Sequence, residues 1–246
     1  MAGSWGTAWL VGMVALMASA PHPGHPERSE GPSRIRAIPM LTLMSQPIGR
    51  SARDDGVRAA PDWLRLARDI HSEINTARRD PAAYASHLEQ LLPRFDATLL
   101  ERPGRPHLRT EEGAAAVREA IAALQSRGPV GPLRFSDGLT AAAADHVEDQ
   151  GPVGGLEHLG TDGSDPADRA SRYGQWVGAM AENIAFGENP AREVVIQLLV
   201  DDGVSDRGHR DNLLDPKWGA EGVACGPHRD YRQICVMDYA VNYVER

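Results

Sequence analysis

The sequence predicts an α+β protein in which helices pack over a small antiparallel sheet. Apolar side chains recur at helical spacing through most of the chain from residue 62 onward. Strand-like patterns, by contrast, cluster late, at about 219–226 and 231–240. The length of 246 residues, with 41% hydrophobic and 24% charged side chains, suits one sizeable core. This composition excludes a disordered or collagen-like polymer.

Six helices are expected, and a capping residue or a proline in the first turn marks the predicted start of each one. Short polar side chains accept hydrogen bonds from free backbone N–H groups, and proline fits the first turn of a helix. The expected starts are Asp62, Asp80-Pro81, Thr110, Ser136, Asp165-Pro166 and Asn189-Pro190. Two long polar, glycine-containing loops are expected after Gly151 and over residues 203–216, and loops of this length usually carry function.

The first quarter of the chain is not expected to join the folded domain. Residues 1–20 are a candidate signal peptide, because an apolar run ends in Ala18-Ser19-Ala20 and is too short to span a bilayer. Residues 21–61 are proline-rich and indicate a disordered linker, or sequence upstream of a true start at Met40 or Met44. The folded domain is therefore expected to span 62–246.

Charge and aromatic content argue against nucleic acid as a partner. The chain carries 26 Lys and Arg against 34 Asp and Glu, a net charge of -8, and only 5% of its residues are aromatic. No strong positive field is available to hold a polyanion.

The two cysteines fall in the late strand pair. Cys225 and Cys235 are each flanked by strand-like residues and enclose a glycine and a proline, which predicts a hairpin closed by a disulfide. A zinc site would need further ligands, and only His228 is near in sequence. Two buried thiols in a reduced cytoplasmic protein are the other alternative.

Two histidines and one glutamate are the candidate functional residues, since no standard catalytic motif is present. His158 and His209 lie in the two polar loops, and Glu182 lies among small apolar residues, where a buried carboxylate needs a partner. Two imidazoles with a carboxylate suit a divalent ion such as zinc, with ordinary loop hydrogen bonding as the alternative. His146, on the apolar face of its helix, is expected to be a hydrogen-bonded core histidine.

Four segments of the sequence, taken in their order along the chain, resemble the motifs of a known family. They are HLGTDGSDPADRASRYG, AENIAFG, DRGHRDNLLDP and WGAEGVACGPHRDYRQICVMDYA. Together they resemble the CAP superfamily of cysteine-rich secretory, antigen 5 and pathogenesis-related proteins, also called the SCP domain. The resemblance runs from about Leu64 to Tyr243.

This resemblance implies a three-layer α-β-α sandwich whose central cleft is lined by two histidines and two acids, often around zinc or another divalent ion. Carried over position by position, the histidines are His158 and His209 and the first acid is Glu182. The second acid is best matched by Asp162. The family also implies an extracellular or periplasmic location.

Three functions are compatible with these residues. The first is a secreted, monomeric binding domain without a membrane span, which takes a divalent ion, a small ligand, a lipid or a peptide. The second is a hydrolase of the peptidase kind, in which Glu182 acts as general base beside zinc, or Ser205 is activated by His209. The third is a hydrogen-bonded network that only pins loops to the sheet.

Overall fold

The computed structural model describes residues 61–246 and the backbones of two short strands near the N-terminus, β1 (Ala8–Trp9) and β2 (Leu16–Ser19). The rest of the predicted signal peptide and nearly all of the predicted linker lie outside the described residues. Within the part that is described, no helix is both long and apolar enough to cross a membrane.

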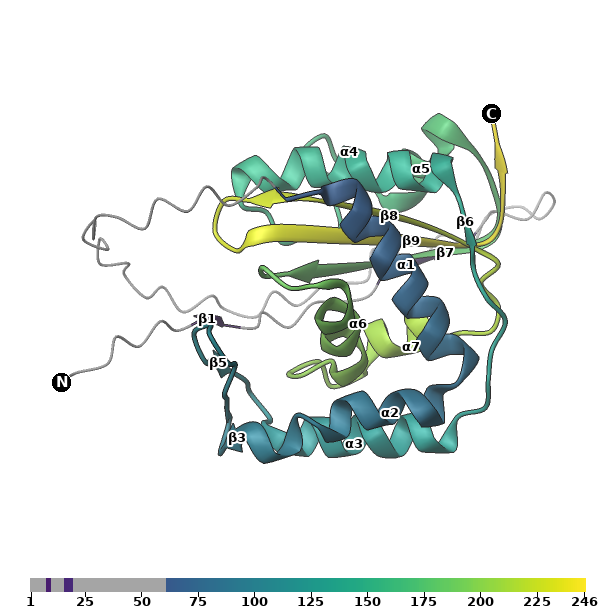
Figure 1. Ribbon diagram of the computed structural model, residues 1–246. Coiled ribbons are helices and arrows are strands. Elements are labelled where there is room, and N and C mark those ends of the chain that lie inside the picture. Colours follow the sequence, from purple (N-terminus) through teal and green to yellow (C-terminus); the bar gives the residue numbers. More distant parts are fainter. Residues whose placement is uncertain (1–7, 10–15, 20–60) are drawn as a thin grey trace, which may run out of the picture. The chain divides into compact units, whose positions relative to one another are not determined.

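Three layers make up the folded domain, as Figure 1 shows. The central sheet has the strand order β2-β7-β9-β8-β6, with β6 (Arg134–Phe135), β7 (Gly174–Phe186), β8 (Ala220–His228) and β9 (Arg232–Glu245). One face is covered by α4 (Asp137–Val153) and α5 (Pro166–Tyr173). The other is covered by α1 (Trp63–Arg79), α6 (Ala191–Val200) and α7 (Gly208–Leu214). The predicted α-β-α sandwich is confirmed.

The remaining elements lie beyond the α6 side of the sheet. Helices α2 (Pro81–Glu89) and α3 (Ala114–Ser126) pack against each other, and α3 also contacts α6 (Figure 1). Between them come a 3-10 turn, η1 (Leu92–Arg94), and the short strands β3 (Phe95–Asp96), β4 (Leu99–Leu100) and β5 (Leu108–Arg109), joined in the order β1-β5-β4-β3.

Capping explains why four of the helices begin where the sequence predicts. The side chains of Asp62, Asp80, Ser136 and Asp165 each accept a hydrogen bond from a backbone N–H three residues on. Asp165 and Asp168 form a reciprocal capping box at the start of α5.

The expected cap at Thr110 is wrong. Helix α3 begins at Ala114, after Gly113 with φ +65°, and Thr110 instead donates from its amide and its hydroxyl to the carbonyl of Thr98. Thr110 therefore ties the end of β5 back toward β4. Glycine suits position 113 because a Cβ there would lie 2.7 Å from the carbonyl oxygen of Ala97.

The hairpin of β8 and β9 forms as expected. Cys225 and Cys235 are directly opposite each other in the register and are joined by a disulfide. At Gly222 in β8, an added Cβ would lie 2.1 Å from the backbone carbon of Leu139 in α4. The absence of a side chain lets α4 lie directly on the sheet.

The main difference between the structure and the sequence prediction is β7, a strand of 13 residues that the sequence did not predict. It pairs antiparallel with β9, Glu182 facing Asp238, and a bulge between Val177 and Met180 inserts one extra residue into β7. Beyond the bulge, side chains alternate between two cores. Ile184 packs under α4, whereas its neighbour Ala185 belongs to the core of the α1 and α6 side.

Candidate functional site

Strand β7 positions the candidate site because its consecutive residues Glu182 and Asn183 point into opposite layers. Glu182 lies with α4 and α5, while Asn183 donates to the carbonyl of His209 in α7 at 2.9 Å. Asn212, also in α7, donates to the side-chain oxygen of Asn183 at 3.0 Å. One strand therefore fixes groups on both sides of the sheet.

Glu182 is fully buried, and both of its carboxylate oxygens are occupied. Oε2 accepts from a guanidinium N–H of Arg169 in α5 at 2.6 Å, and Oε1 lies 2.7 Å from Nδ1 of His158. Burial raises the pKa of Glu182, while Arg169 acts in the opposite direction. The arginine contact keeps the charge on Glu182, because a guanidinium hydrogen bond favours the ionised carboxylate.

Asp238 lies opposite Glu182 on β9 and shares its burial. Neither of its oxygens has a hydrogen-bond partner that meets normal geometry among the described residues. Burial, followed by repulsion from Glu182, raises the pKa of Asp238 well above its ordinary value. We therefore assign the proton of this carboxyl pair to Asp238 and the charge to Glu182.

His158 stands in the loop after α4 with its side chain only 10% exposed. Burial lowers its pKa to about 4, and the charges of His209 and Arg169 act in the same direction. At neutral pH the ring is therefore uncharged. Because Nδ1 faces the Glu182 carboxylate, we assign the proton to Nδ1 and the lone pair to Nε2.

His209 is the second residue of α7, and Asp201 holds it in place. One Asp201 oxygen lies 2.7 Å from Nδ1 of His209 and the other accepts from the backbone N–H of His209 at 2.9 Å. Asp201 itself has φ +54° at the C-cap of α6, a conformation that aspartate tolerates better than most residues. Nε2 of His209 is buried and has no hydrogen-bond partner within the described chain.

The two histidines thus form similar carboxylate-anchored pairs, Glu182–His158 and Asp201–His209. They lie close enough for the charge of His209 to depress the pKa of His158. We call His158, Arg169, Glu182, Asp201 and His209 the histidine cluster.

The structure does not bring the other two predicted site residues into this cluster. Asp162 is 60% exposed and binds Arg172 at 2.9 Å and the amide of Ser164 at 2.9 Å. Ser205 is exposed in a turn, and no hydrogen bond joins it to His209 in the part of the chain that the structure describes. The acid beside His209 is Asp201 instead.

Three contributors were not singled out from the sequence: Arg169, Asp201 and Asp238. Asp201 comes directly before Asp202 in a loop that holds several acids, so nothing local separates it from them. Arg169 looks like one more arginine of an exposed helix. The partner that each of these residues meets lies on another element, and only the tertiary structure pairs them.

The cluster offers a metal ion two protein ligands, the imidazole rings of His158 and His209. Carboxylates at Nδ1 orient both rings in the way that metal-binding histidines are commonly oriented, and His209 Nε2 is a buried, unpaired nitrogen. Glu182 is already bound to Arg169 and His158. Across the described residues, no three His, Cys, Asp or Glu side chains are arranged to hold an ion together. Any further ligands would have to be water or groups of a bound molecule.

The α-β-α sandwich and the histidine cluster are consistent with the family that the sequence resembles, and a comparison with known protein families tests this. The family model for the cysteine-rich secretory protein family, CAP, matches residues 71–239. The chain belongs to the CAP family.

Two solved structures are similar to it at low identity. One is an extracellular protein containing an SCP domain from Bacillus anthracis, 22% identical, with a TM-score of 0.35, covering 45% of this chain and 34% of that one. The other is an outer surface protein from Borrelia burgdorferi, 18% identical, with a TM-score of 0.39, covering 54% of this chain and 96% of that one. This chain thus spans about a third of the Bacillus protein. No curated protein matches the sequence.

Proposed function

We propose that this protein is an extracytoplasmic CAP-domain protein whose His158 and His209 together bind a divalent cation such as Zn²⁺. The observation that carries the proposal is the matched pair of imidazoles. Each has a carboxylate at Nδ1, and the Nε2 of His209 is buried without a partner among the described residues. Leaving a buried polar atom unpaired costs about 1 to 3 kcal/mol, so a ligand that engages it is favoured.

The ionisation state supports binding at neutral pH. A metal binds only the unprotonated nitrogen of a histidine, and the lowered pKa of His158 keeps its ring uncharged. Glu182 and Asp201 would serve as the acceptors that orient the rings. A bound Zn²⁺ would supply a Lewis acid to a small ligand, lipid or peptide that reached this position.

The disulfide supports the proposed location. Cys225 and Cys235 are bonded in the structure, and such bonds persist mainly in the periplasm or outside the cell.

Measuring the zinc content of the purified protein tests whether His158 and His209 bind a metal. Tag-free protein should take up about one Zn²⁺ per chain, measured by elemental mass spectrometry and calorimetric titration. His158→Ala and His209→Ala should each lose it, while His87→Ala, a histidine on α2, should not. If the wild type takes up no zinc, or the two cluster variants retain it, the proposal is wrong.

Hydrolysis is the second candidate, and the Asp201–His209 pair is what favours it. An imidazole with a carboxylate at Nδ1 and an unpaired Nε2 is arranged as a general base. Glu182 is less suited to that role, since Arg169 and His158 occupy its oxygens. If peptide hydrolysis is detected, His209→Ala should abolish it. Full activity in Glu182→Gln would remove Glu182 from the mechanism.

A further inference from the structure

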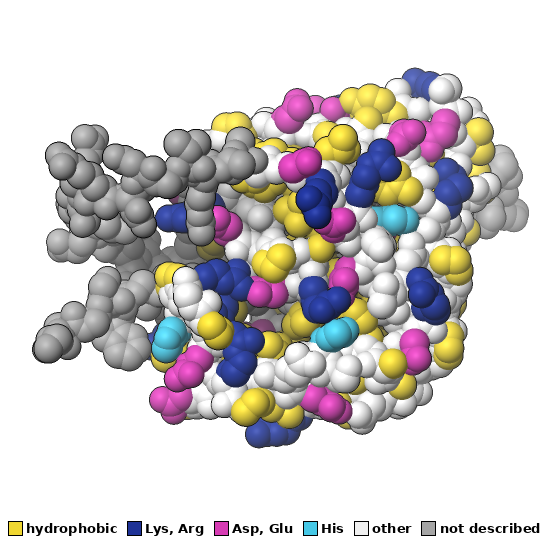
Figure 2. All heavy atoms as spheres, in the orientation of Figure 1, with side chains coloured by type: hydrophobic (Ala, Val, Ile, Leu, Met, Phe, Trp, Pro, Cys, Tyr) yellow, Lys and Arg dark blue, Asp and Glu magenta, His cyan; other side chains and the backbone are white. Residues whose placement is uncertain are grey.

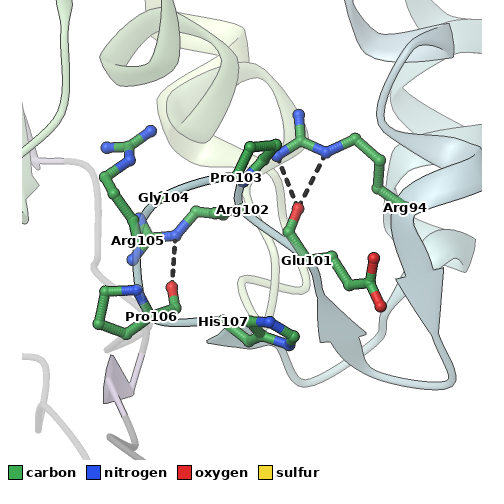
Figure 3. A pocket seen from close by; sticks show the side chains of 8 residues that line it. All are labelled: Arg94, Glu101, Arg102, Pro103, Gly104, Arg105, Pro106 and His107. Atoms are coloured by element: carbon green, nitrogen blue, oxygen red, sulfur yellow. Dashed lines mark hydrogen bonds between the residues drawn. The ribbon is translucent and has the colours of Figure 1, made fainter.

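A cavity lies at the loop between β4 and β5. The cavity has a volume of about 530 Å³. Figure 3 shows the loop curving around it, with Arg94 from η1 on one side. Arg94, Arg102 and Arg105 are among its lining residues, together with Glu101 and two prolines. None of the lining residues belongs to the histidine cluster.

The loop is held in shape by guanidinium groups that bind backbone carbonyls. Arg94 donates twice to the carbonyl of Glu101, at 2.9 and 2.6 Å, and Nε of Arg102 donates to the carbonyl of Pro106 at 3.0 Å (Figure 3). A guanidinium carries five N–H donors. Arg102 also donates from Nη1 to the side-chain oxygen of Asn189 at 3.5 Å. Both arginines still keep further N–H donors on side chains that line the cavity.

The residues that line this cavity carry more positive than negative charge, with three arginines and one glutamate. One guanidinium nitrogen of Arg105 donates to both carboxylate oxygens of Glu193 in α6, but neither Arg94 nor Arg102 has a carboxylate ion-pair partner among the described residues. Burial, followed by the charge of Arg105, lowers the pKa of Arg102. Glu101 is the single acid among the lining residues. Figure 2 shows basic side chains among acidic ones at the end of the domain that carries β3 to β5.

We propose that this cavity binds a small phosphate or sulfate monoester, with the oxyanion held between Arg94 and Arg102. Forked guanidinium donors match the oxygens of such groups, and an anion there would relieve the repulsion between the arginines. The cavity lies within the range of small-molecule sites and exceeds a bare ion. Pro103, Pro106 and His107 offer flat surfaces for the organic part of the ligand.

Calorimetric titration at low salt tests the proposal, with glucose 6-phosphate, inorganic phosphate and uncharged glucose as probes. The ester should bind more tightly than inorganic phosphate, and glucose should not bind. Arg102→Gln and Arg94→Gln should each weaken ester binding by about tenfold or more, since a charge-assisted hydrogen bond is lost. Arg65→Gln, an exposed arginine of α1, is the matched control and should change nothing.

A second variant answers the concern that the arginine substitutions merely disturb the loop. Glu101→Gln leaves the backbone carbonyl that holds Arg94 unchanged and removes the one acid of the lining. It should strengthen ester binding severalfold, whereas Glu148→Gln on α4 should not.

Three results would overturn the proposal. They are no ester binding up to ~10 mM, which corresponds to a negligible affinity; equal affinities for the ester and inorganic phosphate; or unchanged ester binding in Arg102→Gln. His158→Ala/His209→Ala protein should bind the ester like the wild type. This result separates the cavity from the proposed metal site.

Discussion

The two faces of the sheet each bury a glutamate, and comparison of the two shows what distinguishes a candidate site from a structural network. On the α1 face, Glu221 of β8 is fully buried and lies 2.7 Å from Nδ1 of His71. The other ring nitrogen of His71 is bonded to Asn75 at 3.1 Å, and Asn75 in turn binds the backbone of Leu133. Both nitrogens of this histidine are used.

On the opposite face, Glu182 likewise binds a histidine through Nδ1, but the resulting cluster is not closed. Arg169 supplies a full positive charge, and the nearby His209 keeps an Nε2 that no described residue pairs. The two glutamates are equally buried, so burial does not separate them. Glu221 Oε1 also lacks a hydrogen-bond partner among the described residues, so the difference lies in the histidines: both ring nitrogens of His71 are bonded, whereas Nε2 of His209 is not.

The largest expected effect comes from removing the positive charge. Arg169→Met leaves the buried Glu182 carboxylate without its cation, which should destabilise the fold by about 3 to 5 kcal/mol. Arg172→Met, on the same helix but with a 42% exposed side chain, should cost less than about 1 kcal/mol. Urea unfolding measures both. Equal losses in the two variants would mean that Glu182 does not depend on its cation.

The next effect is a dependence of stability on pH in which the buried histidines and the buried carboxyl groups act in opposite directions. Burial lowers the pKa of His146 and His158 from 6.5 to about 4, so the unfolded chain binds more protons between these values. Their contribution is complete above pH 6.5 and is lost toward pH 4, by up to about 3 kcal/mol each. Glu221, Glu182 and Asp238 act oppositely, since burial raises the pKa of each and their contribution is lost as the pH rises.

Unfolding free energies measured across this pH range separate the two contributions. His146→Leu should flatten the loss of stability on the acid side, and Glu221→Gln should steepen it. A His146→Leu curve parallel to that of the wild type would contradict the assignment of a buried, uncharged histidine.

The smallest effect concerns the orientation of His209. Asp201→Asn should weaken zinc binding by about 10- to 100-fold, because the group that orients the ring becomes a weaker acceptor. Nitrogen NMR of the metal-free protein should show a change in the His209 tautomer. Asp162→Asn, which alters an exposed acid from the same sequence block as His158, should leave zinc affinity unchanged. The reverse ranking of the two variants would restore Asp162 as the second acid.

Local signals predicted much of the fold. Asp62, Asp80, Ser136 and Asp165 cap helices through bonds to amides three residues away, so a short window contains the whole cause. Strand β7 was missed because its small residues, such as Ala181 and Ala185, carry no strand signal and become buried only when two layers cover them.

The sequence identified some residues of the candidate site and missed others. His158, Glu182 and His209 were singled out from their sequence context, and the family resemblance matched the same three residues; in the structure His158 contacts Glu182 and lies near enough to His209 to feel its charge. Asp201 and Arg169 were not, because their roles depend on contacts with residues 8 and 13 positions away on other elements. Spacing alone does not encode such contacts.

The bulge in β7 has a consequence for how this chain can vary. Because Glu182 and Asn183 point into opposite layers, the single extra residue between Val177 and Met180 helps to decide which layer each one enters. A deletion or insertion of one residue between the bulge and Glu182 would exchange the two side chains and send the carboxylate toward α7 and the amide toward Arg169. A change in the length of this segment would therefore disrupt the site even if every side chain of the site were kept.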